Sequence, residues 1–320
     1  MQLSRRNFLY ALGALSSAPF LFSVEGCAPK DAESVADGKL AILVAVDPIA
    51  YFVERVGGDN VVVAALTPQG KDPESFAPTP GSLKAVAATK IFFRVGLPIE
   101  ERFARNIAAI APNAETVDLR DELDMLASEH HHHHHDEDDH EHEHEHEHDD
   151  ESLDAHVWTS PANVRLMTKK VAETLAEADP ANAETYRANA AALDAELVAL
   201  QAETAERLAP YADRGFFVFH PAYGYYAREF DLKQYAIEFE GKAPRPRDLN
   251  DLIERVKKEQ VTKLIVQPEF NRSSAQAVAN AIDGELVDHS PLIKDYFANI
   301  RGITDAVVDS FESADRRSPQ

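Results

Sequence analysis

The sequence is poor in cysteine, because Cys27 is the only one among 320 residues. A single cysteine excludes a disulfide framework and a zinc site built from several thiolates. Basic residues are also scarce: 32 Lys and Arg stand against 55 Asp and Glu, which gives a formal net charge of −23. This balance argues against a nucleic-acid-binding protein, since phosphate contacts require a basic face.

The N-terminus has the pattern of an export signal over residues 1–26. Ser4-Arg5-Arg6-Asn7-Phe8-Leu9 resembles a twin-arginine signal, and the apolar run that follows is short for a membrane span of about 20 residues. Val24-Glu25-Gly26-Cys27 then resembles a lipoprotein cleavage site, although Glu25 is unusual there and an ordinary signal peptide is the alternative. We therefore expect a periplasmic or otherwise extracytoplasmic protein, lipidated at Cys27 and anchored to the membrane through a tether over 27–39.

Histidine is abundant, and most of it lies in one segment. Of 14 histidines, 11 fall between His130 and His148, and the stretch 129–151 adds 12 acidic residues and no Lys or Arg. Such a composition cannot build a core and predicts a loop that is disordered without metal. Its neutral imidazoles would make it a weak metal collector whose binding fades below about pH 6.5, with a solubilising insertion as the alternative. The histidines concerned are His130, His131, His132, His133, His134, His135, His140, His142, His144, His146 and His148.

The rest of the mature chain alternates between strand-like and helix-like patterns. In the first half, 40–160, continuous apolar runs predict buried strands, and periodic segments between them predict helices. The expected strands are 40–46, 61–66, 91–95 and 115–119, and the expected helices are 48–56, 81–88 and 98–110. This alternation is typical of a parallel sheet covered by helices.

A helical segment over 161–210 separates this half from a second alternating region over 211–313, which is followed by a tail over 314–320. Within the helical segment, Asp179-Pro180 predicts the start of a helix reaching Ala209, about 45 Å long. The later region predicts strands 215–220, 234–239, 261–266 and 285–288, and helices 221–229, 247–258, 273–282 and one from Tyr296 to Phe311. The predicted fold class is therefore α/β, with two parallel-sheet lobes joined by a long rigid helix and a ligand site in the cleft between them.

Metal-capable side chains follow several predicted strands. Glu74 lies in the loop after the second strand, His156 follows the histidine-rich loop, and His220 and Asp288 each end a strand of the second lobe. Imidazole and carboxylate are ligands that suit zinc, manganese or iron(II). These side chains could all face one cleft between the lobes and hold a metal ion.

Four segments form an ordered set of motifs: Asp72-Pro73-Glu74-Ser75-Phe76-Ala77-Pro78-Thr79-Pro80, Asp154-Ala155-His156-Val157-Trp158, Phe219-His220-Pro221-Ala222-Tyr223, and Val287-Asp288 with Tyr296 beyond. This set resembles the zinc/manganese solute-binding proteins of ABC importers, the cluster A-I, adhesin-like family. The resemblance covers about residues 40–311 and includes the position of the histidine-rich loop of zinc-uptake members. It implies a metal held between two lobes, with Glu74, His156, His220 and Asp288 as its ligands, and then handed to a membrane permease.

One residue departs from the family pattern. A histidine ligand usually follows the Asp-Pro dipeptide in this family, and here Glu74 follows it. Two histidines with two carboxylates favour manganese or iron(II), whereas the histidine-rich loop favours zinc or nickel. We expect zinc, because the affinity order places zinc above manganese at a given nitrogen and oxygen site. If Glu74 does not bind, three protein ligands and a water remain.

Other residues near these motifs have plainer interpretations. His289 is next to Asp288, and successive strand residues point to opposite faces, so we do not expect His289 to bind the metal. Tyr223, Tyr225 and Tyr226 are expected in the core. Arg245 and Arg247 form either a solvated face or a contact between the lobes.

The predicted function is an extracytoplasmic receptor that binds a divalent metal, with zinc favoured, and delivers it to an ABC permease and its ATPase. We expect a monomer that performs no covalent chemistry. A zinc hydrolase is one alternative, but it needs an open coordination position, and four strand-end ligands leave none obvious. A metal-buffering or adhesion protein without a transporter is the other.

Overall fold

The computed structural model describes residues 38–77, 86–128, 153–238, 246–259, 261–270 and 272–317. All of them belong to one compact unit over 34–320. Several predictions fall outside the described residues: the export signal, Cys27, nearly all of the tether, the histidine-rich loop and Arg245, as well as the side chain of Arg247.

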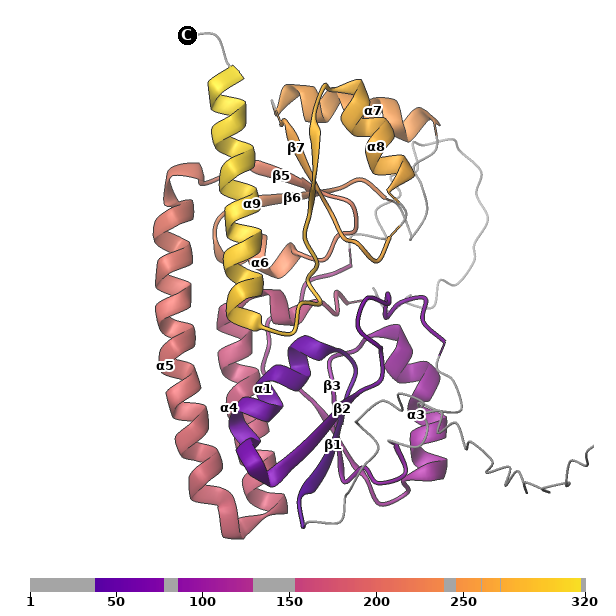
Figure 1. The fold of residues 1–320 in the computed structure, drawn as a ribbon, viewed down its shortest axis with the longest axis vertical. Coiled ribbons are helices and arrows are strands. Elements are labelled where there is room, and N and C mark those ends of the chain that lie inside the picture. The colour runs from indigo at the N-terminus through magenta and orange to yellow at the C-terminus, as the bar shows by residue number, and fades with distance from the viewer. Residues whose placement is uncertain are drawn as a thin grey trace, which may run out of the picture. The chain divides into compact units, whose positions relative to one another are not determined.

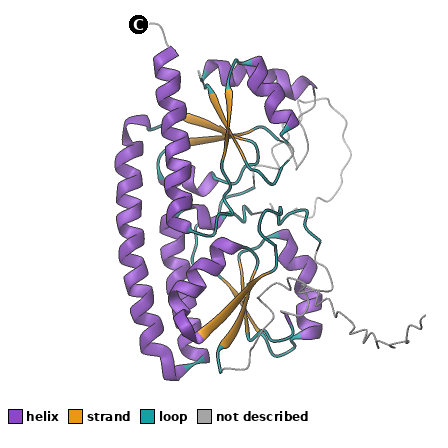
Figure 2. Ribbon diagram, in the orientation of Figure 1, coloured by secondary structure: helices purple, strands orange, loops and turns teal. Residues whose placement is uncertain are grey.

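The first sheet has four parallel strands in the order β2-β1-β3-β4. Figure 2 shows the strands in orange, in two separate groups with helices beside each. Its central strand β1 is buried along nearly its whole length, as expected for a parallel strand covered on both faces. The strands are β1 (Leu40–Val44), β2 (Val61–Ala65), β3 (Ile91–Arg94) and β4 (Glu115–Asp118). Helices α1 (Asp47–Gly57) and α3 (Pro98–Ile110) belong to this half of the chain, each with a proline in its first turn.

The second sheet repeats this arrangement, with parallel strands in the order β6-β5-β7-β8. The strands are β5 (Gly215–Val218), β6 (Lys233–Ala236), β7 (Lys263–Val266) and β8 (Glu285–Asp288). The helices of this half are α6 (Gly224–Glu229), α7 (Pro246–Lys258), α8 (Ser273–Ala281) and α9 (Tyr296–Arg317). Two four-stranded parallel sheets confirm the predicted α/β class.

Between the two sheets in the sequence lie α4 (Pro161–Ala178) and α5 (Ala183–Leu208). Helix α5 packs against its neighbour α4, against α1 of the first half and against α9 of the second (Figure 1). Its buried side chains follow helical spacing and include Tyr186, Leu193, Leu197, Leu200 and Leu208. A helix of 26 residues that contacts elements from both halves fits the predicted rigid connection.

The structure moves the ends of some predicted elements. The long helix does not begin at Pro180, because residues 180–182 form a separate 3-10 turn in which the Asp179 carboxylate accepts hydrogen bonds from Asn182 and Tyr186. Helix α6 begins at Gly224 rather than at Pro221, and the residues before it form an irregular bend after His220. Helix α9 continues to Arg317, so residues 314–317 are helical rather than part of a tail.

Apolar packing joins the halves. One cluster of buried side chains runs from β1 and β3 through α4 and α5 to α9, and a smaller one fills the space beneath α7 and α8 around Phe217 and Leu264. Within the described ranges, no helix combines the length and apolar character needed to cross a bilayer.

Candidate metal centre

The strand order determines where a ligand site can form in each sheet. In the second sheet the chain leaves β5 toward β6 on one side and reaches β7 on the other. Crevices that bind ligands in open α/β sheets form beyond the carboxyl ends of strands at such a switch point. His220 lies two residues beyond β5, and Gln267 directly follows β7. Side chains from neighbouring loops therefore meet at this edge.

Glu74 is held in place by its own loop and by α3. The Asp72 carboxylate accepts hydrogen bonds from the backbone N–H groups of Glu74 and Ser75, at 2.9 and 3.2 Å, which closes a tight turn. The Arg102 guanidinium then donates to three carbonyl oxygens of the loop, those of Pro73, Glu74 and Phe76. These contacts fix the backbone from which the half-buried Glu74 side chain projects.

His156 is presented by a short segment that leads into α4. Its Nδ1 lies 2.8 Å from the Asp154 carboxylate, and the same carboxylate oxygen accepts the His156 backbone N–H. Ser160 caps α4 by accepting the N–H of Asn163. Trp158, fully buried, donates its indole N–H to the carbonyl of Pro291 in the second half at 3.0 Å. The segment is thus anchored at both ends.

Three side chains, those of Gln267, Phe270 and Glu238, hold His220 in position. The Gln267 side chain accepts the His220 backbone N–H and donates to its carbonyl, at 3.0 and 2.7 Å. The Phe270 ring stacks on the imidazole, with centroids 4.8 Å apart. The carboxylate of Glu238, whose side chain is fully buried, lies 2.5 Å from Nδ1. The remaining ring nitrogen, Nε2, faces the cleft.

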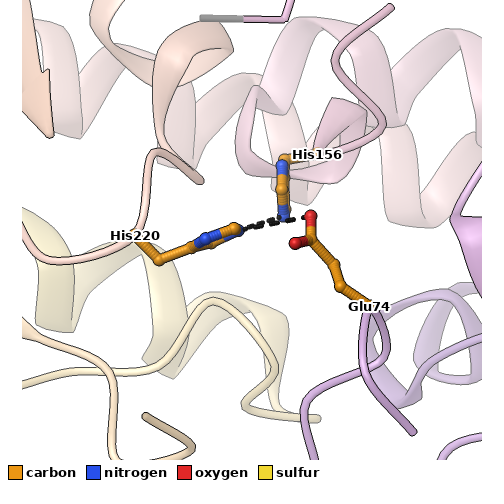
Figure 3. A group of neighbouring side chains, drawn as sticks. All are labelled: Glu74, His156 and His220. Atoms are coloured by element: carbon orange, nitrogen blue, oxygen red, sulfur yellow. Dashed lines mark hydrogen bonds and ion pairs between the residues drawn. The ribbon is translucent and has the colours of Figure 1, made fainter. Parts of the chain in front are cut away.

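Glu74, His156 and His220 converge on one point (Figure 3). Within the described part of the chain, this is the group whose ligand atoms all lie within 4.8 Å of one another. The two Nε2 atoms are 3.3 Å apart, and His220 Nε2 lies 3.6 Å from a Glu74 oxygen. Two nitrogens bonded to one tetrahedral zinc at about 2.05 Å would be separated by about 3.3 Å. The histidine pair therefore already has the spacing of two ligands on a single ion.

The protonation pattern also favours a cation between the rings. Each Nδ1 is directed at a carboxylate and so carries the proton, which leaves a lone pair on each Nε2 of the neutral rings. Two lone pairs at 3.3 Å repel unless a proton or a metal ion lies between them. Burial lowers the pKa of His156, but Asp154 and the more distant Glu74 and Asp72 outweigh that effect and leave the pKa above its usual value. The carboxylates around the two imidazoles therefore favour a positive charge at this position.

The structure does not bring Asp288 into this group. Its carboxylate forms an ion pair with Arg272, and its side chain is about half exposed. The reason is strand order: β8 is separated from β5 by β7, so the ends of β8 and β5 lie about 10 Å apart across the sheet. Ligation by Asp288 stays a prediction, and it would require the pair with Arg272 to break.

The other predicted residues are core elements. His289 is buried and bonds Asn299 through Nε2 at 2.9 Å, outside the group. The three tyrosines Tyr223, Tyr225 and Tyr226 are fully buried, and Tyr225 donates its hydroxyl to the carbonyl of Asp154. Sequence reasoning gave no role to Asp154, Glu238 or Arg102. The Asp-x-His spacing could have identified Asp154, whereas nothing local to the sequence pairs Glu238 or Arg102 with the site.

Comparisons with known proteins agree with this architecture. A crystal structure of ZnuA is 30% identical, with a TM-score of 0.76, and the match covers 85% of this chain and 99% of that one. The high-affinity zinc uptake system protein ZnuA of Yersinia pestis is 22% identical over 256 residues, covering 75% of this chain and 79% of the relative. The manganese-binding lipoprotein MntA of Halalkalibacterium halodurans is 24% identical over 260 residues, covering 80% of each.

The family described as zinc-uptake complex component A, periplasmic, matches residues 42–310. This range includes all but the first two residues of the sheets, the connecting helices and all three converging side chains. The chain belongs to the family of periplasmic component A of zinc-uptake complexes.

Proposed function

We propose that this protein is the extracytoplasmic, high-affinity receptor for a divalent metal ion, with zinc favoured, and that it delivers the ion to an ABC importer. The ion is cargo, held by Glu74, His156 and His220. The protein performs no covalent chemistry. Family membership and the zinc-binding and manganese-binding relatives support this function.

One observation carries the proposal. Two buried imidazoles, each with its Nδ1 committed to a carboxylate, aim their Nε2 atoms at each other across 3.3 Å. Outer carboxylates of this kind fix the tautomer of metal-binding histidines and raise the basicity of the ligand nitrogen. A histidine pair that served only packing would not need both Nδ1 atoms paired with carboxylates.

Manganese is the second candidate, and Glu74 is the observation that favours it. A carboxylate at this position makes the site harder than one with three histidines, which suits manganese or iron(II). A manganese-binding relative is also similar to this chain over most of its length. Zinc remains favoured, because it binds a given nitrogen and oxygen site more tightly than manganese.

Release of the ion requires partners. We propose a permease with its ATPase in the cytoplasmic membrane, and a monomeric receptor held near them by a lipid on Cys27. The histidine-rich loop would collect metal weakly near the membrane surface and raise its local concentration. Lipoprotein relatives support the anchored form.

The test is a metal titration of three variants. His156→Ala should abolish the one tight site, because it removes one of the two facing imidazoles. Deletion of 129–151 should remove only weak additional sites. His289→Gln is the matched control, since it changes a buried histidine outside the group and should leave the tight site intact. A tight site that survives His156→Ala would overturn the proposed location.

Competition between zinc and manganese at the loop-deleted protein identifies the cargo. Without the loop, the titration reports on the cleft alone. We expect zinc to displace manganese. A preference for manganese would refute the choice of zinc and leave the receptor function standing.

A further inference from the structure

We propose that Glu269, rather than Asp288, supplies the fourth ligand of the bound ion, through its Oε2 atom. This inference rests on the proposed metal-receptor function. It makes the completed site one of two imidazoles and two carboxylates, all from the described part of the chain.

Only one of the two oxygens of the Glu269 carboxylate has a hydrogen-bond partner among the described residues. Its Oε1 accepts a hydrogen bond of 2.6 Å from the Ser290 hydroxyl. Its Oε2 is buried and has no hydrogen-bond partner among the described residues. A buried carboxylate oxygen without a donor is costly, because it has lost its hydration and gained nothing in return. A cation is the partner that such an oxygen lacks.

Glu269 also lies at the cavity beside the two metal-binding histidines. It lines a small cavity together with His156, His220 and a second acidic residue, Asp72. The volume of that cavity is about 10 Å³, which is room for one water-sized group. An ion bound to the two imidazoles would therefore lie at this cavity. Of the two carboxylates in its lining, Asp72 already accepts hydrogen bonds from Glu74 and Ser75, whereas Glu269 has an oxygen without a partner among the described residues.

Topology explains why Glu269 is better placed than Asp288. Glu269 follows β7, which is the direct neighbour of β5, the strand that leads to His220. Asp288 ends β8, one strand further out, and its charge is already balanced by Arg272. Ligation by Asp288 requires a broken ion pair and a move across one strand. Glu269 is also outside the group of atoms within 4.8 Å of one another, so its side chain must move to bind the ion, but no ion pair among the described residues has to break, because Ser290 holds only Oε1.

The experiment compares Glu269→Gln with Asp288→Asn in the loop-deleted protein, titrated with zinc. Both changes are nearly isosteric and remove one negative charge. In Glu269→Gln the new amide keeps an oxygen that can accept from Ser290, so the metal-free protein should melt at the temperature of the parent. We expect Glu269→Gln to weaken zinc binding by on the order of 100-fold or more, because loss of a direct ligand should cost at least as much as the most costly loss of an outer carboxylate. Asp288→Asn should change the affinity by less than about threefold, as expected for an exposed pair.

Cobalt(II) provides a second readout, because its visible absorption depends on the ligands. We expect Glu269→Gln to alter the cobalt spectrum and Asp288→Asn to leave it unchanged. The reverse pattern, with affinity and spectrum sensitive to Asp288→Asn only, would overturn the inference, and so would an unchanged Glu269→Gln. In either case loss of binding in His156→Ala would still support the receptor function. Retention of binding in His156→Ala would instead defeat the function itself.

Discussion

Glu238 offers a test of how outer carboxylates affect metal affinity, because it contacts His220 and would not contact the ion itself. Its side chain is fully buried and that of His220 is 3% exposed, with 2.5 Å between Oε1 and Nδ1. Glu238→Gln keeps the shape and an acceptor oxygen but removes the negative charge. The His220 ring should stay in place while its Nε2 becomes a weaker donor to the ion.

The expected magnitude follows from this arrangement. Outer carboxylates on metal-binding histidines are typically worth 10–100-fold in affinity, about 1.4–2.8 kcal/mol. Because glutamine retains an acceptor, Glu238→Gln should fall at the lower end, with about tenfold weaker zinc binding. Glu238→Ala leaves the Nδ1–H unpaired in a buried position and should approach about 100-fold.

The assay is competition with a zinc-chelating dye in the loop-deleted protein, so that only the cleft contributes. Glu254→Gln, an exposed charge on α7 of the same lobe, is the control and should bind as the parent does. Thermal melting without metal reports any loss of folding, which is most relevant to the alanine variant. If Glu238→Gln folds normally and binds zinc within about twofold of the parent, the carboxylate does not tune His220, and this reasoning is refuted.

Three other predictions address the neighbouring elements. Glu74→His should tighten zinc binding and increase the preference for zinc over manganese by on the order of tenfold, measured by competition; an unchanged preference would mean that Glu74 does not bind the ion. Arg102→Gln should weaken zinc binding roughly fivefold by releasing the carbonyls of the Glu74 loop, about 1 kcal/mol, whereas exposed Arg105→Gln on the same helix should not. Burial raises the pKa of Glu100 to about 7, so the folded state holds its proton more tightly than the unfolded chain does. The free energy of unfolding should therefore fall by up to about 3 kcal/mol as pH rises through the window from 4.5 to 7. Denaturant titrations at pH 5 and 8 should show this fall in the parent and in exposed Glu101→Gln but not in Glu100→Gln.

Much of the fold follows from local sequence patterns. A continuous apolar run such as 40–46 indicates a strand buried on both faces, and β1 occupies its first five residues. The proline near the start of 98–110 and the spacing of Phe103 and Ile107 predict a helix, and α3 has those bounds. These signals are contained within each segment. Element type and approximate position could therefore be inferred without knowledge of any tertiary contact.

Residues that depend on distant partners are harder to infer. Arg102 acts on a loop 26–29 residues earlier in the chain, and Glu238 acts on a histidine 18 residues earlier. Neither residue belongs to a local pattern that involves the site. Their roles arise because the fold brings separate segments together, and the spacing of residues along the chain contains no record of that approach.

A pattern of alternating strands and helices in the sequence does not give the order of the strands within the sheet, and the identity of the fourth ligand depends on that order. Asp288 and Glu269 both follow strands of the second lobe, so a rule based on strand ends alone treats them equally. What separates them is the lateral order β6-β5-β7-β8, in which β7 adjoins β5 and β8 does not. Glu269, beyond β7, therefore lines the same cavity as His220, whereas Asp288, at the end of β8, is paired with Arg272. We therefore expect strand pairing to determine which of the two acidic residues binds the metal, and substitution of each acid in turn tests this expectation through the affinity for the metal.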